Sequence, residues 1–280
     1  MIPRLRLAPP PRVPLAEATP AGREIWRNPH NDTVVHSYWT PGRHWLEVPS
    51  LARYYFGPES EAVMALPDPS ADRQTVRDTY YRVVLPLVLQ ARGTEVLHAS
   101  GIRRPEGVIA LCAESETGKT TMAYGLSRRG YPMWADDAVA WRPAVGGFEA
   151  IPLPFSAGLR PPSLAFFAGS EATRGQKPLP FGPRSAAPLA AILVLTHAHA
   201  GAPLVTGRRM APAAAFRAVL AHGQSFNLGD VDHKRRMLEH YLGVAAQVPV
   251  LSIAFVPGFG HYPAVLDAVE ALLAQLPAPD

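Results

Sequence analysis

The feature of this sequence that most restricts its fold is an apolar run that leads through a short loop into a helix. Residues 108–112 are continuously apolar, as in strands that are buried on both faces of a sheet. Residues 113–120 follow with the sequence AESETGKT, which fits the phosphate-binding pattern GxxxxGK(S/T) except that alanine takes the first glycine position. Residues 118–129 then have the composition of a helix, with Gly130 and Pro132 as stop signals. This order predicts an α/β fold.

A loop of this kind binds phosphate because the N–H groups at a helix N-terminus have no partner within the helix and favour negative charge. We expect Lys119 to reach the β- and γ-phosphates of a nucleotide and the Thr120 hydroxyl to bind Mg²⁺. The side chain of Ala113 is expected to narrow the loop, since glycine at this position allows close approach of the backbone. The candidate nucleotide-binding residues of the segment are Ala113, Glu114, Ser115, Glu116, Thr117, Gly118, Lys119, Thr120 and Thr121.

Two aspartates end the next predicted strand, residues 133–135, so that strand, helix and strand form a βαβ unit. Ligands of open α/β sheets gather at the carboxyl ends of strands. One aspartate is therefore expected to bind Mg²⁺ and the other to take the proton of an attacking hydroxyl. His98, on the strand before the loop, is expected to point toward the γ-phosphate. The candidate catalytic residues are thus Asp136, Asp137 and His98, and the candidate metal ligands are Thr120 and Asp136, with the choice of base left open.

Composition along the chain divides it into three parts. Residues 1–20 are basic and rich in proline, and we interpret them as an extended leader that lacks the apolar segment of a secretory signal. Residues 21–93 predict a small N-terminal α+β module, in which strand-like runs precede an amphipathic helix. Residues 94–280 contain the loop and are interpreted as a nucleotide-binding α/β domain.

Periodicity and turn residues predict the elements of these parts. In the module, the predicted strands are residues 33–40, 43–48 and 62–66, and the predicted helix is 75–92 with a kink at Pro86. In the larger domain, the further predicted strands are 95–100, 190–196 and 249–256, and the further predicted helices are 212–221 and 263–276.

Residues 152–188 are rich in proline and predict a long irregular connection. Arg160 and Lys177 lie within it and are candidate nucleotide-binding residues, because a long loop can fold over a ligand and clamp its phosphates. His222, by contrast, is interpreted as part of a solvated helix surface.

Composition also excludes several classes of protein. Cys112 is the only cysteine of the 280 residues, so neither an internal disulfide nor a multi-cysteine zinc site can form. No apolar run approaches the roughly 18 residues of a membrane helix. The formal net charge of +4 is too small to indicate nucleic acid. We therefore expect a cytoplasmic protein with no nucleic-acid or membrane partner.

Three segments, in the same order, resemble the catalytic core of the HPr serine kinase/phosphorylase family. They are residues 97–100 (LHAS), the loop at 113–120, and residues 128–137, which run from RRGY to ADD. In that family a histidine precedes a GDSGxGKS loop, and a helix ending in RG leads to an ADD segment whose carboxylates bind metal and transfer protons. The rest of the chain is more similar to HPr-kinase-related proteins of peptide biosynthetic clusters, such as lasso peptide tailoring kinases. The resemblance implies a mixed sheet with flanking helices, and ATP and Mg²⁺ as cofactors.

The function favoured by these observations is an ATP-dependent phosphotransferase that acts on a Ser/Thr-type hydroxyl of a peptide or protein. One alternative is a non-catalytic ATP-binding regulatory or partner protein of a biosynthetic cluster, which Ala113 and the loop glutamates favour. A carboxykinase-like lyase is a weaker alternative, since it would need further metal ligands before the loop. A homo-oligomer is left open, because the family that the chain resembles forms rings.

Overall fold

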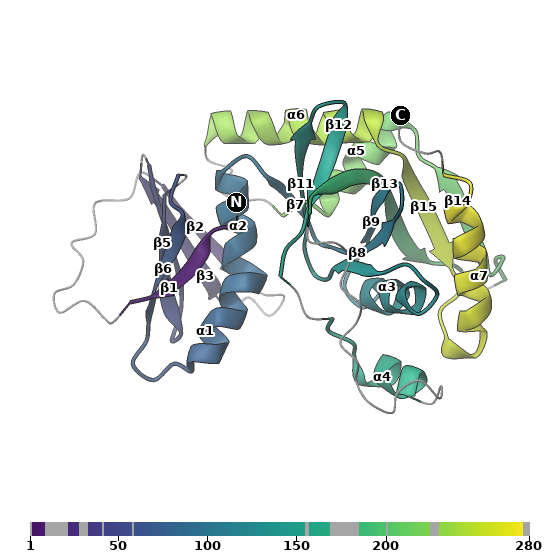
Figure 1. Cartoon of the computed structure of the whole chain (residues 1–280), viewed down its shortest axis with the longest axis horizontal. Helices are drawn as coiled ribbons and strands as arrows, with labels where there is room; N and C mark the ends of the chain where they lie inside the picture. Colours follow the sequence, from purple (N-terminus) through teal and green to yellow (C-terminus); the bar gives the residue numbers. More distant parts are fainter. Residues whose placement is uncertain are drawn as a thin grey trace. The chain divides into compact units, whose positions relative to one another are not determined.

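The computed structural model of the protein describes residues 2–8, 22–27, 33–40, 42–57, 59–154, 157–168, 185–199, 201–224 and 230–276. Its contacts divide the chain into two compact units (Figure 1). Unit 1 comprises Met1–Thr94 and Ser225–Met237, and unit 2 comprises Glu95–Gln224 and Leu238–Asp280. Each unit has its own sheet. No helix among the described residues is both long and apolar enough to span a membrane.

Unit 1 is built on a six-stranded sheet with the order β1-β6-β5-β4-β3-β2. Its neighbouring strands are antiparallel except for β1 and β6, which are parallel. The three strands predicted for this module are confirmed, whereas β2 and β5 were not predicted and β1 lies within the segment interpreted as a leader. The strands are β1 (Arg4–Leu7), β2 (Gly22–Arg27), β3 (Thr33–Thr40), β4 (Arg43–Val48), β5 (Ala52–Phe56) and β6 (Ala62–Pro67).

The predicted helix of unit 1 is present but is divided by a wider turn. It consists of α1 (Arg73–Thr79), a π-helical turn η1 (Tyr80–Val84) and α2 (Leu85–Ala91). Asp72 caps the start, since its side chain accepts a hydrogen bond from the Thr75 N–H. A π turn lies directly before Pro86, which has no N–H to continue the ladder of hydrogen bonds. The kink expected at Pro86 stays a prediction. Tyr54 anchors the helix to the sheet through a 2.8 Å hydrogen bond from its hydroxyl to the Val76 carbonyl.

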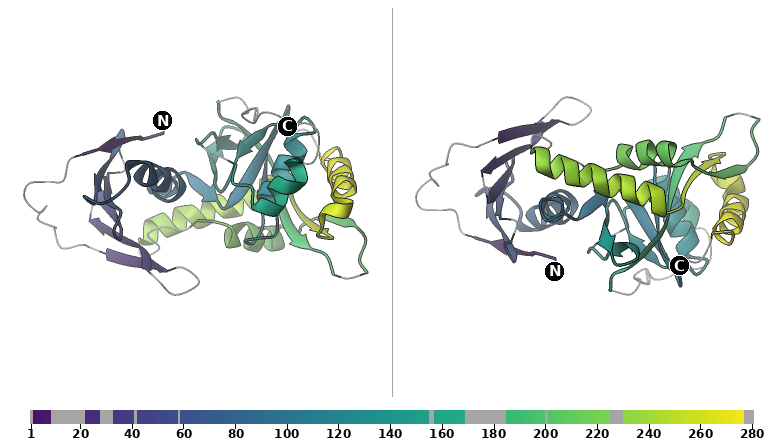
Figure 2. Two further views of the ribbon diagram at one scale, coloured as in Figure 1. Left: turned by 90° about the horizontal axis from the view of Figure 1, so that it is seen from below. Right: turned by 90° about the horizontal axis from the view of Figure 1, so that it is seen from above.

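Unit 2 is a mixed α/β structure whose nine-stranded sheet has helices on both sides (Figures 1 and 2). The main strand order is β10-β8-β9-β13-β12-β11-β7, and β15 pairs with both β13 and β14. Helix α3 lies on one side of this sheet, and α5 and α6 lie on the other (Figures 1 and 2). The strands are β7 (Glu95–Leu97), β8 (Ala99–Arg104), β9 (Gly107–Cys112), β10 (Met133–Ala135), β11 (Val139–Ala144), β12 (Gly147–Ile151), β13 (Ala187–His197), β14 (Val205–Arg209) and β15 (Val250–Phe255). The helices are α3 (Lys119–Ser127), α4 (Pro161–Ala168), α5 (Pro212–Ala221), α6 (Val231–Gln247), which begins in unit 1, the 3-10 turn η3 (Phe259–His261) and α7 (Tyr262–Leu273).

The predicted βαβ unit is confirmed, with one strand inserted in it. Strand β8 pairs antiparallel with both β9 and β10, so β9 and β10 are parallel to each other. The chain passes from β9 through α3 to β10. Strands β9, β13 and β15 form a parallel set, and their carboxyl ends lie at the edge of the sheet where the loop begins.

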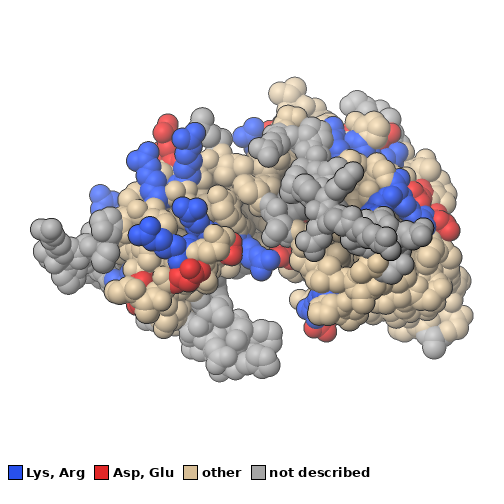
Figure 3. Space-filling view, turned by 60° about the horizontal axis from the view of Figure 1, so that its bottom comes forward, with Lys and Arg blue, Asp and Glu red and all other residues tan. Residues whose placement is uncertain are grey.

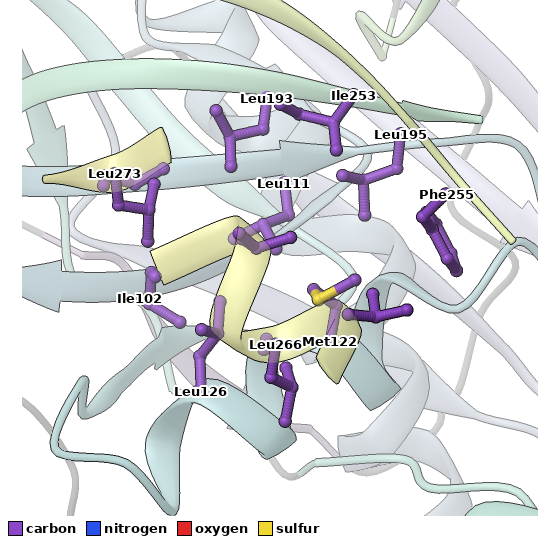
Figure 4. Close-up of a cluster of buried hydrophobic side chains, with 14 of the residues drawn as sticks. Ile102, Leu111, Met122, Leu126, Leu193, Leu195, Ile253, Phe255, Leu266 and Leu273 are labelled. Atoms are coloured by element: carbon purple, nitrogen blue, oxygen red, sulfur yellow. The ribbon is translucent and has the colours of Figure 1, made fainter. Parts of the chain in front are cut away.

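The core of unit 2 forms where α3 and α7 pack on this parallel set (Figure 4). Leu111 of β9, Leu193 of β13 and Ile253 of β15 face Met122 of α3 and Leu266 of α7. All five side chains are nearly or fully buried. Burial of this apolar surface fixes the first turn of α3 against the sheet, and the loop before it is therefore held at both ends.

Some elements of unit 2 differ from the sequence prediction. The strand expected over residues 95–100 is broken at His98, because β7 pairs with β11 whereas β8 pairs with β9 and β10. Helix α4 lies inside the stretch predicted to be irregular. It begins at Pro161, and proline is compatible with the first turn of a helix because the N–H there has no intrahelical partner.

Basic and acidic side chains lie beside one another on the face shown in Figure 3. Surface ion pairs of this kind contribute about 0–1 kcal/mol each, so they have little influence on the fold. Ion pairs among the described residues include Arg53 with Glu47, Arg129 with Asp267 and Glu270, and Arg142 with Glu149.

Candidate functional site

Residues 113–118 connect β9 to α3, and their backbone curls at two positions. Glu116 has a φ of 70° and Gly118 has a φ of 105°. Ala113, at the first position of the motif, has no positive φ and belongs to the buried core of unit 2. The expectation that its Cβ narrows the loop is therefore wrong, because the methyl group packs into the core beneath the loop. Glu114, Ser115 and Glu116 form the exposed part of the loop.

Replacing Ala113 by glycine tests this placement. We expect Ala113→Gly to change the affinity of the protein for Mg·ATP by less than about twofold, because no glycine conformation is needed there. The same change should lower stability by about 1 kcal/mol, since it removes a buried methyl group and adds backbone freedom to the unfolded chain. Titration with Mg·ATP and denaturant unfolding measure the two effects. Much tighter nucleotide binding by the variant would contradict the assignment of the methyl group to the core.

Lys119 begins α3 and is held along the loop. Its ammonium group donates a 2.9 Å hydrogen bond to the Ala113 carbonyl, and only 8% of the residue is exposed. Burial lowers the pKa of Lys119 below its usual range, while the nearby charges of Asp137 and Asp136 act in the opposite direction. The Lys119 ammonium therefore bonds a backbone carbonyl of the loop itself. From this position it can turn to an anion bound in the loop.

Asp136 is the polar centre of the site. One of its carboxylate oxygens accepts hydrogen bonds from the Ser100 hydroxyl at 2.7 Å and the Thr120 hydroxyl at 2.8 Å. The other accepts from the Gly158 N–H at 2.9 Å. Asp136 therefore joins β8, α3 and the segment before α4. Ser100 and Gly158 were not predicted as site residues, although Ser100 ends the LHAS segment at residues 97–100 that carries the family resemblance.

Asp137 follows Asp136 in the chain and contacts His98. The Asp137 side chain is exposed, and its backbone is left-handed with a φ of 63°. Its carbonyl contacts Nδ1 of His98 at 3.2 Å. Because a carbonyl oxygen only accepts hydrogen bonds, Nδ1 is assigned the proton and Nε2 is left as an acceptor. Burial and the Lys119 charge lower the pKa of His98, against opposing effects from Asp137 and Asp136, so the ring is neutral at pH 7.

His222 belongs to this site, so its interpretation as solvated helix surface is wrong. It is half-buried at the end of α5, and its carbonyl accepts a 2.8 Å hydrogen bond from the His98 N–H. Burial and the charges of Lys119 and His98 lower its pKa, and Glu114 opposes this effect. The Leu97–Gly223 bridge holds the two segments together. Only this long-range pairing brings His222 to the loop, and no local sequence signal indicates it.

The remaining candidates lie around the loop. Arg160 forms a 2.6 Å ion pair with Glu116. Thr121, in the first turn of α3, shares a 2.8 Å hydrogen bond with the Ser163 hydroxyl of α4. His197, which is not among the predicted site residues, contacts the Thr117 carbonyl through Nε2 at 3.2 Å. Lys177 lies outside the described residues. No group of three or more His, Cys, Asp or Glu side chains suited to a metal ion occurs within the described ranges.

Comparison with known proteins shows distant structural similarity and no match in sequence. No protein-family model matches the chain, and no curated protein matches it in sequence. Among solved structures, the chain is similar to the HPr(Ser) kinase/phosphatase from Coxiella burnetii, with a TM-score of 0.35 and 14% sequence identity. That match covers 64% of this chain and 88% of the other. A similarity at this level assigns no activity to the chain.

Proposed function

We propose that the protein is an ATP-dependent phosphotransferase that moves the γ-phosphoryl group to a Ser/Thr-type hydroxyl of a peptide or protein. The observation that carries this proposal is the 2.8 Å hydrogen bond between Thr120 and Asp136, directly after a loop that holds a buried lysine. Phosphoryl transfer needs a cradle for phosphates, a site for a divalent cation and a base, placed next to one another. The loop, Asp136 with Thr120, and Asp137 with His98 supply these three parts.

The residues present fit Mg²⁺, which prefers oxygen ligands. Asp136 offers a carboxylate and Thr120 a hydroxyl, and these are already within hydrogen-bond distance of each other. When bound, the ion neutralises charge on the phosphates. The N–H groups at the start of α3 and the Lys119 ammonium would hold the same phosphates through hydrogen bonds.

Proton transfer would fall to Asp137 and His98. Asp137 is exposed, so its carboxylate can reach an acceptor hydroxyl from solvent, whereas Asp136 is buried among three donors. His98 presents Nε2 as an acceptor because its Nδ1 is engaged with the Asp137 carbonyl. A neutral imidazole beside a carboxylate is a suitable base near pH 7.

The low pKa of His98 gives a pH dependence with a defined sign. Because burial and Lys119 favour the neutral ring, the transfer rate should stay constant as the pH falls from 8 to about 6.5, the ordinary histidine pKa. It should decline below that, when Nε2 takes a proton. His98→Asn keeps a donor for the Asp137 carbonyl but has no base, and we expect a loss of about 100-fold in rate. An unchanged acid limb in the pH profile of the variant would show that another group titrates there.

The proposal is tested by supplying ATP labelled at the γ-phosphate, Mg²⁺ and peptides that contain serine or threonine. We expect label in a peptide, stable to acid, since phosphate esters of hydroxyls survive acid whereas phosphohistidine and acyl phosphates do not. Acid-labile label would contradict a hydroxyl acceptor. No binding of Mg·ATP, either by the wild-type protein or by variants that remove the acidic charge of the loop, would contradict the proposal as a whole.

The second candidate is a non-catalytic ATP-binding regulatory or partner protein of a biosynthetic cluster. It is favoured by the two exposed glutamates of the loop, which repel phosphate, and by Asp136, whose oxygens already have three protein donors. Stoichiometric binding of Mg·ATP without labelled product, across peptides encoded beside the protein, would support this function over transfer.

A further inference from the structure

Glu116 occupies a backbone conformation that glycine adopts more readily. Its φ of 70° lies in the left-handed region, where a side chain strains the chain and where glycine is the usual residue. The position is exposed, so packing does not require a glutamate there. A strained residue beside a binding loop is a reason to look for a role of its side chain.

The Glu116 side chain forms an ion pair with Arg160. Its carboxylate contacts the Arg160 guanidinium at 2.6 Å, and the two side chains are 71% and 64% exposed. Exposed pairs of this kind are weak, because water competes for both charges. Little free energy is therefore lost when Arg160 leaves Glu116 for an anion that binds it more strongly.

The backbone around Arg160 is fixed to the site on both sides of the arginine. Gly158 donates its N–H to Asp136 at 2.9 Å. Ser163, in the first turn of α4, shares a hydrogen bond with Thr121 at 2.8 Å. The Arg160 carbonyl also accepts from the Leu164 N–H at 2.9 Å, which ties it to α4. The backbone of Arg160 is thus fixed beside the loop, while its exposed guanidinium forms the ion pair with Glu116.

We propose that the Glu116 carboxylate competes with nucleotide phosphate for Arg160, so that the ion pair restrains nucleotide binding until phosphate displaces it. The inference rests on the proposed function of the loop and names a regulating contact within it. A guanidinium binds carboxylate and phosphate through the same forked geometry, and phosphate carries more charge. On binding, Arg160 moves from Glu116 to phosphate, and the freed carboxylate returns to water. Glu116 opposes nucleotide both by holding Arg160 and by its own charge.

Titration with Mg·ATP tests the proposal on the full-length protein and its variants. Glu116→Gln removes the charge, and we expect binding to tighten by about fivefold. Glu116→Gly also accommodates the left-handed backbone and should tighten binding in the same direction. Arg160→Ala should weaken binding by about tenfold, because it removes a charge-assisted contact to phosphate. In the Glu116→Gln background, Arg160→Ala should weaken binding further than in the wild type, since no competing pair has to be broken first.

The matched control is Glu149→Gln. Glu149 forms an ion pair of the same 2.6 Å length with Arg142 on the β11–β12 hairpin, away from the loop. This variant loses one carboxylate and one exposed pair, and its affinity for Mg·ATP should stay within about twofold of the wild type. Wild-type binding with no tightening in either Glu116 variant would overturn the inference and leave the proposed function standing. Absence of binding in the wild type and in both Glu116 variants would overturn both. Binding of Mg·ATP by the Glu116 variants alone would show that the Glu116–Arg160 pair prevents the wild type from binding nucleotide.

Discussion

Replacing Lys119 by alanine should abolish the stabilisation of the protein by Mg·ATP. A ligand at about 100 times its dissociation constant stabilises a folded protein by roughly 2.7 kcal/mol. The wild type should therefore unfold at a clearly higher temperature with nucleotide than without it. In the variant, the loop keeps its N–H groups but loses the cation that neutralises phosphate charge in a partly buried site. We expect at least a 100-fold loss of affinity, so that millimolar nucleotide gives little shift.

The fold of the variant should survive, because Lys119 makes only one hydrogen bond that the structure shows, to the Ala113 carbonyl. Its loss costs on the order of 1 kcal/mol, and alanine is a good helix former at the first turn of α3. Lys234→Ala is the matched control, since Lys234 is exposed on α6 and lies outside unit 2. It should respond to Mg·ATP as the wild type does. If Mg·ATP raised the unfolding temperature of Lys119→Ala as much as that of the wild type, the nucleotide would not depend on Lys119. The proposed role of this loop in binding phosphate would then be wrong.

The sequence predicts the local parts of this site well, because those parts depend on neighbouring residues. Apolar runs and stop signals predict β9, α3 and β10, and the order of these elements predicts a loop at the carboxyl end of a buried strand. The same argument predicts that Asp136 lies near Thr120, since both follow parallel strands of one sheet. Site residues can therefore be predicted from the sequence when their positions follow from the order of strands and helices along the chain.

Contacts that depend on long-range pairing could not be predicted. His222 reaches His98 only because residue 223 bridges to residue 97. Gly158 contributes a backbone N–H, which every residue but proline has, so its identity carries no signal. Ser100 bonds Asp136 because the chain changes its pairing at His98, where β7 ends and β8 begins to pair with β9 and β10. An apolar run in the sequence does not indicate such a change of partner.

Proline was the least reliable guide to local structure. A high proline content predicted an irregular connection over residues 152–188, but Pro161 starts α4. Within the helix of unit 1, Pro86 is preceded by a π turn in which the Leu85 N–H bonds to the Tyr80 carbonyl. In both places proline changes the hydrogen-bond pattern near a helix start without preventing helix.

The two aspartates should separate into different roles when each is replaced by asparagine. Asparagine tolerates the left-handed backbone of Asp137 as well as aspartate does, and the hydrogen bond to His98 uses the carbonyl at that position. Asp137→Asn should therefore keep the melting temperature and the nucleotide shift of the wild type. If Asp137 carries the base, phosphoryl transfer should fall by about 100-fold or more.

Asp136→Asn is the matched variant, with the same change in charge at the neighbouring residue. Its hydrogen bonds can be kept, because an amide can donate to the Ser100 and Thr120 hydroxyls and accept from the Gly158 N–H. What it loses is the charge that would hold Mg²⁺. We expect nucleotide binding by this variant to become about tenfold weaker and nearly independent of Mg²⁺, whereas binding by Asp137→Asn should still require the ion. Titrations with and without Mg²⁺, together with transfer assays, measure both effects. The opposite pattern, with Mg²⁺ dependence lost only in Asp137→Asn, would exchange the two roles and make the buried carboxylate the base.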